Sequence, residues 1–148
     1  MEQNSFSVRE YTPEQKEPLL DFLEQCLPES GRVLELQGRH SFYLDIPSQF
    51  ERFWCLYCGQ ALIGTVALKR LSSTGCELKS LYLSQAYQGK GMGRKLLELG
   101  ISTARQKGYE QMYLDTMLTS SRAIQLYKRA GFVPTEPYHH NPHADLFL

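Results

Sequence analysis

The stretch CELKSLYLSQAYQGKGMGRKLLELG, residues 76–100, decides the fold. Residues 76–83 follow a turn and predict a strand, and the spacing of apolar residues becomes helical from Gly91 to Lys107. Three glycines fall within residues 88–93, where the helix begins. The first backbone N–H groups of a helix have no intrahelical acceptor and carry partial positive charge, so glycines here let an anion approach. On these residues alone, a phosphate-binding loop and a merely flexible connection explain the pattern equally well.

Upstream of this stretch, the sequence predicts a run of antiparallel strands. RFWCLYC (52–58) and ALIGTVALK (61–69) are rich in apolar and β-branched residues, and Gly59-Gln60 between them predicts a tight hairpin turn. The turn SSTG (72–75) then leads into the opening stretch. We therefore expect three consecutive antiparallel strands.

The N-terminal part adds a strand and a helix. FSVREY (6–11) predicts the first strand, and a helix should follow, with Thr12 as its cap and Gln15 closing a capping box. Pro18 either kinks this helix or marks its true start, and Pro28 predicts its end.

The C-terminal part predicts a strand at 110–117, a helix at 120–131 and short strands at FVP (132–134) and ADLFL (144–148). The fold class is therefore α/β, with a mixed sheet that is mostly antiparallel and has helices on both faces. The strand, glycine loop, helix and next strand should form a right-handed parallel crossover. We expect a single domain over residues 1–148.

Composition excludes several classes of protein. The chain has 148 residues, and its 16 basic residues balance its 16 acidic ones, which argues against a general binder of nucleic acid or anionic membranes. No apolar run approaches the roughly 20 residues that a membrane helix needs. The polar N-terminus, MEQNSFSVRE, lacks the apolar core of a signal peptide, so a cytoplasmic location is expected.

The four cysteines, Cys26, Cys55, Cys58 and Cys76, are interpreted as buried free thiols. Cys55 and Cys58 form a CxxC within a predicted strand, where residues three apart point to opposite faces. That geometry suits neither a zinc site nor a redox pair.

Two common nucleotide motifs fail on detail. A GxGxxG beginning at Gly89 would need its third glycine at Arg94, and the P-loop pattern GxxxxGK[ST] is absent. The dinucleotide fold would also begin with a strand–helix–strand unit, which this chain does not.

Two segments resemble the signatures of one family. QGKGMG (88–93) matches the Q/R-x-x-G-x-G/A signature of the GNAT superfamily of N-acetyltransferases, and AIQLYKRAGF (123–132) matches a second signature at the right distance. Residues 76–133 look like this superfamily continuously, and the likeness fades before residue 50. The resemblance implies a splayed parallel strand pair, acetyl-CoA as donor and a primary amine as acceptor. It also implies direct attack in a ternary complex, without a metal or a covalent cysteine intermediate.

The resemblance also implies the role of residues that bind the donor. Those expected to hold the CoA diphosphate, mostly through backbone N–H groups, are Gln88, Gly89, Lys90, Gly91, Met92 and Gly93, with Arg94 and Lys95 adding positive charge. The backbone of Leu81, Tyr82 and Leu83 would pair with the pantetheine arm, and a nearby backbone N–H would polarise the acetyl carbonyl. Ser120 stands where many members carry an Asn near the pantetheine.

Two residues are expected to transfer protons. Tyr127 matches the tyrosine that usually protonates the departing thiolate, and its alternative is simple core packing. Glu77 stands in a register where some members place a general base, and its alternative is a solvated strand residue paired with Lys79.

The acceptor remains open. Its pocket is expected between the region after the first helix and the C-terminal segment, with candidate side chains Arg32, Arg39, His40, Tyr43 and Arg52. His139, His140 and His143 would line this site, and a metal site or an alternative proton acceptor there is disfavoured. A small-molecule amine such as an amino-acid derivative, polyamine or amino-sugar is preferred. Alternatives are a protein lysine or N-terminal amine, or a non-catalytic acyl-CoA-binding module, and a homodimer is possible.

Overall fold

The structure is a computed structural model that describes residues 6–29, 43, 45–116, 121–134 and 146–147. Its strands are β1 (Phe6–Glu10), β2 (Arg52–Cys58), β3 (Ala61–Arg70), β4 (Gly75–Leu83), β5 (Gln111–Tyr113), β6 (Asp115–Thr116) and β7 (Leu146–Phe147). Its helices are α1 (Lys16–Glu29), α2 (Ile46–Gln49), α3 (Met92–Gln106) and α4 (Ser121–Arg129), with 3₁₀ turns η1 (Pro13–Gln15) and η3 (Gln85–Tyr87).

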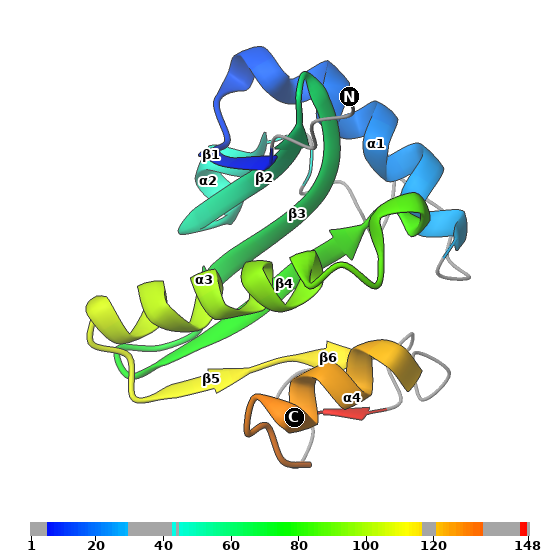
Figure 1. The fold of residues 1–148 in the computed structure, drawn as a ribbon. Helices are drawn as coiled ribbons and strands as arrows, with labels where there is room; N and C mark the ends of the chain where they lie inside the picture. The colour runs from blue at the N-terminus through cyan, green and yellow to red at the C-terminus, as the bar shows by residue number, and fades with distance from the viewer. Residues whose placement is uncertain (1–5, 30–42, 44, 117–120, 135–145, 148) are drawn as a thin grey trace.

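The strands form one large sheet and one small one (Figure 1). The large sheet has the order β1-β2-β3-β4-β5, and only its last pair, β4 with β5, is parallel. Strands β6 and β7 pair antiparallel in a separate two-stranded sheet. The mixed, mostly antiparallel sheet with a splayed parallel pair is confirmed.

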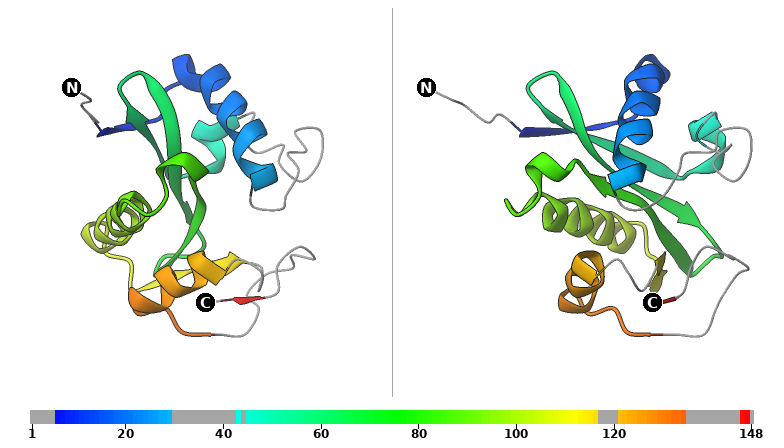
Figure 2. Two further views of the ribbon diagram at one scale, coloured as in Figure 1. Left: turned by 45° about the vertical axis from the view of Figure 1, so that its right-hand side comes forward. Right: turned by 90° about the vertical axis from the view of Figure 1, so that its right-hand side faces the viewer.

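Both faces of the large sheet are covered, with α3 on one side and α1 on the other (Figure 2). Alternation along β2 sends Trp54 and Leu56 into the cluster under α3, and Phe53 and Cys55 into the cluster under α1. Because both faces are buried, the central strands read as nearly continuous apolar runs. The same alternation directs Cys58 away from Cys55, which confirms that this CxxC cannot converge on one ligand.

The N-terminal helix begins with the expected capping residues. The backbone N–H of Thr12 donates to Gln15 Oε1 at 3.3 Å, and η1 leads directly into α1. Pro18 lies in the first turn of α1, where its missing N–H costs no helical hydrogen bond, and Pro28 lies one residue before the end.

Three local expectations differ from the structure. Phe132–Pro134 is irregular rather than a strand. The strand expected at 110–117 is divided into β5 and β6 at Leu114, because the two parts pair with different partners. All four cysteines are free thiols, but Cys58 is half-buried whereas the other three are buried.

Helix α3 packs closely on the sheet because Gly100 faces it. A Cβ at Gly100 would lie 2.8 Å from Leu78 Cδ1 and 3.8 Å from Leu68 Cδ2 and Val66 Cγ2. The absence of a side chain therefore allows the helix to lie close against β3 and β4.

Candidate active site

The centre of the site is the point where β4 and β5 part. The parallel pairing covers only three residue pairs, from Gly75 with Gln111 to Glu77 with Tyr113. Beyond Glu77, β4 continues to Leu83, while the other strand turns away to form β6 and pair with β7 (Figure 1). Within the described part of the chain, the pairing of β5 with β4 therefore stops at Glu77.

A bulge shapes β4 within this released portion. Thr65 pairs with Tyr82 but Ala67 pairs with Lys79, so β4 contains one residue more than β3 over the same interval. The extra residue places Leu78 and Leu81 in the same core cluster, although strict alternation would put residues three apart on opposite faces. The bulge thus turns the backbone of Ser80 and Leu81 just beyond the point where the strands part.

Polar side chains hold the bulge from the other face. Ser80 has φ 55°, and Thr65 Oγ1 donates to the Ser80 carbonyl oxygen at 2.6 Å. The Ser80 and Tyr43 hydroxyl groups form a hydrogen bond of 2.6 Å. No motif in the sequence singles out Ser80 or Thr65. A usable signal was the spacing of leucines at 78, 81 and 83, because a step of three in a strand indicates a bulge.

The glycine loop is open toward solvent at its turning points. Gly89 and Gly91 both have φ +82°, and a Cβ at either would meet nothing within 4 Å. The first hydrogen bond at the start of α3 runs from the Lys95 N–H to the Gly91 carbonyl at 3.1 Å, so the N–H groups just before it lack intrahelical acceptors. Gln88 Nε2 donates to the Leu83 carbonyl at 3.1 Å and ties the loop to the end of β4. A positive helix end therefore lies next to the released strand.

Around the loop, one side chain is buried, and charged side chains lie at its surface. Met92 is buried in the cluster under α3, so its side chain anchors the helix start. Lys90 Nζ lies 5.8 Å from the centre of the Tyr87 ring. Arg94 is exposed and forms an ion pair with Glu98, Nε to Oε2 3.4 Å. Only the charged residues can reach toward a bound anion.

Glu77 and Tyr127 lie on opposite faces of the large sheet. Tyr127 is 7 % exposed, belongs to the α3-side cluster and packs edge-on against Phe132, ring centres 6.0 Å apart. Glu77 alternates with Cys76 and Leu78, which belong to that same cluster, so its side chain points to the α1 side. The parting strands therefore have a carboxylate on one side and a phenol on the other.

The carboxylate of Glu77 is buried, so the alternative interpretation of a solvated strand residue is wrong about its exposure. The residue is only 2 % exposed, and Lys79 Nζ lies 3.5 Å from its Oε1. The expected ion pair is present. Burial strengthens the interaction of a carboxylate with any amine that enters the site, because water screens it less.

The acceptor residues are only partly placed. Arg52 forms an ion pair with Glu10 and lies over the Trp54 ring, and Tyr43 is buried beside Ser80. The other expected residues lie outside the described part of the chain: Arg32, Arg39, His40, Ser120, His139, His140 and His143.

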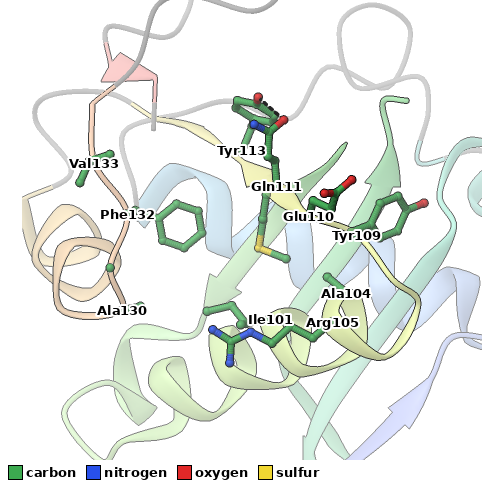
Figure 3. Close-up of a pocket in the computed structure, with 12 residues that line it drawn as sticks. Ile101, Ala104, Arg105, Tyr109, Glu110, Gln111, Tyr113, Ala130, Phe132 and Val133 are labelled. Atoms are coloured by element: carbon green, nitrogen blue, oxygen red, sulfur yellow. Dashed lines mark hydrogen bonds between the residues drawn. The ribbon is translucent and has the colours of Figure 1, made fainter. Parts of the chain in front are cut away.

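A hollow of about 510 Å³ lies at the opposite end of α3 from the glycine loop (Figure 3). Arg105, Tyr113 and Phe132 are among its lining residues, and none of the expected site residues lines it. It lies along β5 and the C-terminal end of α3. In the part of the chain that the structure covers, no cluster of metal-binding side chains occurs. Among those same residues, no helix is long and apolar enough to cross a membrane.

Comparison with known sequences identifies relatives of one kind. Residues 16–132 match the family described as "Acetyltransferase (GNAT) family". An uncharacterised N-acetyltransferase of Schizosaccharomyces pombe is 41 % identical over 81 residues, which cover 54 % of this chain and 50 % of the relative. The mycothiol acetyltransferase of Jonesia denitrificans is 40 % identical over 76 residues, covering 51 % and 24 %. The chain thus spans half or less of the length of these two relatives.

Solved structures share the fold over nearly the whole chain. An acetyltransferase of the GNAT family from Staphylococcus aureus has a TM-score of 0.87 at 21 % identity, covering 97 % of this chain and 96 % of its own. An N-acetyltransferase from Thermoplasma acidophilum, solved in complex with coenzyme A, has a TM-score of 0.76 at 19 % identity, covering 97 % of each chain.

Proposed function

The chain belongs to the GNAT family of acetyltransferases, and from this premise we propose that it transfers an acetyl group from acetyl-CoA to a primary amine of a small molecule. One observation carries the proposal. The parallel strands β4 and β5 part after three residue pairs, next to an open glycine loop at the start of α3. This arrangement offers a strand edge and an anion-binding helix end side by side.

The donor is proposed to bind through the backbone. Its diphosphate would lie on the N–H groups of residues 88–93, where the partial charge of the helix end favours an anion. Its pantetheine arm would run along Leu81–Leu83 like an added strand, because β5 pairs with β4 only from Gly75 to Glu77. The open conformation of Gly89 and Gly91 supports close approach of the phosphates.

Glu77 and Tyr127, on opposite faces of the large sheet, each carry out one of the two proton transfers. Glu77 takes a proton from the attacking amine, whose nitrogen forms a bond to the acetyl carbon. Backbone N–H groups at the β4 bulge stabilise the negative charge on the carbonyl oxygen. Tyr127 then gives its proton to the sulfur as the carbon–sulfur bond breaks. Acetylated amine and CoA are the products.

The preference for a small acceptor rests on two observations. The acetyltransferase of Jonesia denitrificans is named for mycothiol, a small molecule. The balanced charge of this chain gives no general attraction to a charged macromolecule. We propose amino-acid derivatives, polyamines and amino-sugars as the first compounds to test.

Release of free CoA thiol with a panel of such amines tests the activity, and calorimetry measures coenzyme binding separately. Thiol release that depends on one small amine supports the proposal. Coenzyme binding without release on any amine or lysine peptide would instead indicate an acyl-CoA-binding module, and release only with peptides would indicate a protein acceptor.

Glu77→Gln tests the general base. The amide keeps the shape of the side chain but cannot take a proton, so kcat should fall by roughly 100-fold. The affinity for acetyl-CoA should stay within about twofold of the wild type because the coenzyme is held elsewhere. An unchanged kcat would show that Glu77 only pairs with Lys79.

A further inference from the structure

Ser80 holds an unusual backbone conformation at the bulge of β4. Among the residues that the structure describes, it alone is a non-glycine with positive φ, at 55°. A residue with a Cβ avoids this region unless its surroundings compensate. Such strain often marks a position where the backbone is shaped for a purpose.

The surroundings of Ser80 fix it at two points. Thr65, which is fully buried, donates its hydroxyl to the Ser80 carbonyl at 2.6 Å. The Tyr43 hydroxyl meets Ser80 Oγ at 2.6 Å, across 37 positions of sequence. One bond therefore comes from the neighbouring strand and the other from the segment that precedes α2.

Tyr43 is buried and packs against two aromatic rings. It is 2 % exposed, stacks on Phe50 with ring centres 6.2 Å apart and meets Phe53 edge-on at 6.4 Å. This packing holds the ring against the sheet, with its hydroxyl at Ser80. A buried donor or acceptor can hold a strained residue better than an exposed side chain can.

We propose that Tyr43 is a positioning residue for acetyl transfer, acting through Ser80 to hold the β4 bulge in its active shape. The inference rests on the proposed function, in which backbone N–H groups at the bulge stabilise the carbonyl oxygen. Such stabilisation depends on accurate placement of the donors, because they must fit the transition state without reorganising. In this proposal, the cluster under α1 sets the geometry of the acetyl site through Tyr43.

A double-mutant cycle tests whether Tyr43 acts through Ser80. In the wild-type background, Tyr43→Phe should lower kcat about tenfold, as expected for one lost hydrogen bond, while KM for acetyl-CoA changes less than about twofold. In a Ser80→Gly background, glycine adopts the left-handed conformation without help and offers no hydroxyl. There, Tyr43→Phe should lower kcat by less than about twofold.

Two further variants separate positioning from general packing. Tyr11→Phe removes a hydroxyl from another tyrosine that packs edge-on against Phe53, and should leave kcat unchanged. Thr65→Val removes the second bond to Ser80 and should lower kcat in the same direction as Tyr43→Phe. Equal losses for Tyr43→Phe in both backgrounds would overturn the proposal, because Tyr43 would then act independently of Ser80.

Hydrogen exchange gives a readout that does not need activity. Tyr43→Phe should speed exchange of the amides of residues 79–82 severalfold in the Ser80 background and not in the Ser80→Gly background. Unchanged exchange in the Ser80 background would show that Tyr43 does not hold the bulge. Should the wild type release no thiol with any amine, the proposed function fails, while this exchange cycle still decides whether Tyr43 holds the bulge.

Discussion

The two parts of β4 differ although they belong to one strand. Gly75–Glu77 is buried and has a strand on either side, β3 and β5. Leu78–Leu83 is mostly half-buried, contains the bulge and, among the described residues, has only β3 beside it. We call them the paired part and the released part. The paired part supports the fold, and the released part is where we propose that the coenzyme binds.

The largest expected effect concerns the released part and tests its chemistry. Tyr127→Phe removes a hydroxyl near this part while keeping the ring that packs against Phe132. If Tyr127 protonates the thiolate, kcat should fall by roughly 100-fold with little change in thermal stability. Steady-state thiol release and a melting curve measure the two quantities. Full turnover in the variant would assign Tyr127 to core packing alone.

Gly100→Ala tests the boundary between the two parts, because its new Cβ would lie 2.8 Å from Leu78 Cδ1. Crowding should outweigh the better helix propensity of alanine, for a net loss of about 1–2 kcal/mol in the free energy of unfolding. Urea denaturation measures it. Ser102→Ala, at an exposed position of α3, is the control and should lose no stability. A Gly100→Ala protein as stable as wild type would show that α3 can move away from β4 freely.

Gly91→Ala tests the N-terminal end of α3, where we propose that the coenzyme binds. Gly91 and Gly108 flank the same helix with φ +82° and +87°, and neither has a neighbour within 4 Å of a built Cβ. Alanine at either position should cost about 1 kcal/mol of stability through backbone strain. Only Gly91→Ala should also weaken coenzyme binding, about tenfold by calorimetry, since the loop amides would move. Equal affinities for the coenzyme in the two variants would show that the glycine loop does not bind it.

The smallest expected effect concerns the C-terminal end of α3, far from the released part of β4. Tyr109 donates its hydroxyl to Glu51 Oε1, and Lys107 Nζ lies 3.2 Å from Glu51 Oε2, which joins the end of α3 to the start of β2. Tyr109→Phe should cost about 1 kcal/mol of stability and leave kcat unchanged. Denaturation and thiol release measure both. A loss of activity without a loss of stability would contradict the division between the two parts.

The same cluster predicts how stability depends on pH. Burial alone raises the pKa of Glu51, but hydrogen bonds from Tyr109 and Lys107 outweigh it and leave that pKa below its usual value. This contribution is present above the unfolded pKa of 4.5 and is lost as the pH falls through the lower folded value. Burial, together with the bond to Glu51, raises the pKa of Tyr109 to about 12, so its contribution is lost as the pH rises from 10 through about 12. Tyr109→Phe should flatten both limbs of the stability profile.

The sequence predicted those parts of the molecule that depend on neighbours along the chain. The hairpin at Gly59, the loop at 88–93 and the end of α3 at Gly108 all follow from local backbone preference, and the structure shows the expected turns. The strand expected at 110–117 was divided because its second half pairs with β7, a partner 30 residues away. Periodicity reports which face a residue takes, but not which strand lies beside it.

The candidate site was predictable only in part for the same reason. The glycine loop is a local pattern. The contact between Tyr43 and Ser80 spans 37 positions, and no periodic pattern in the sequence indicates it. The burial of Glu77 was also missed, because alternation gave its face but not what covers that face. The roles of Glu77, Tyr127 and the loop, the homodimer, the cytoplasmic location and the single domain over residues 1–148 stay predictions.

The short pairing of β5 has a consequence for solubility. An uncovered strand edge ordinarily invites other chains to add to it, and this leads to aggregation. The released part of β4 spans six residues, about 20 Å at the usual rise per residue, but it lies inside the fork between two strands instead of at the rim of the sheet. The fold would thus keep an edge available for the coenzyme that we propose, away from the rim of the sheet where neighbouring proteins could add to it.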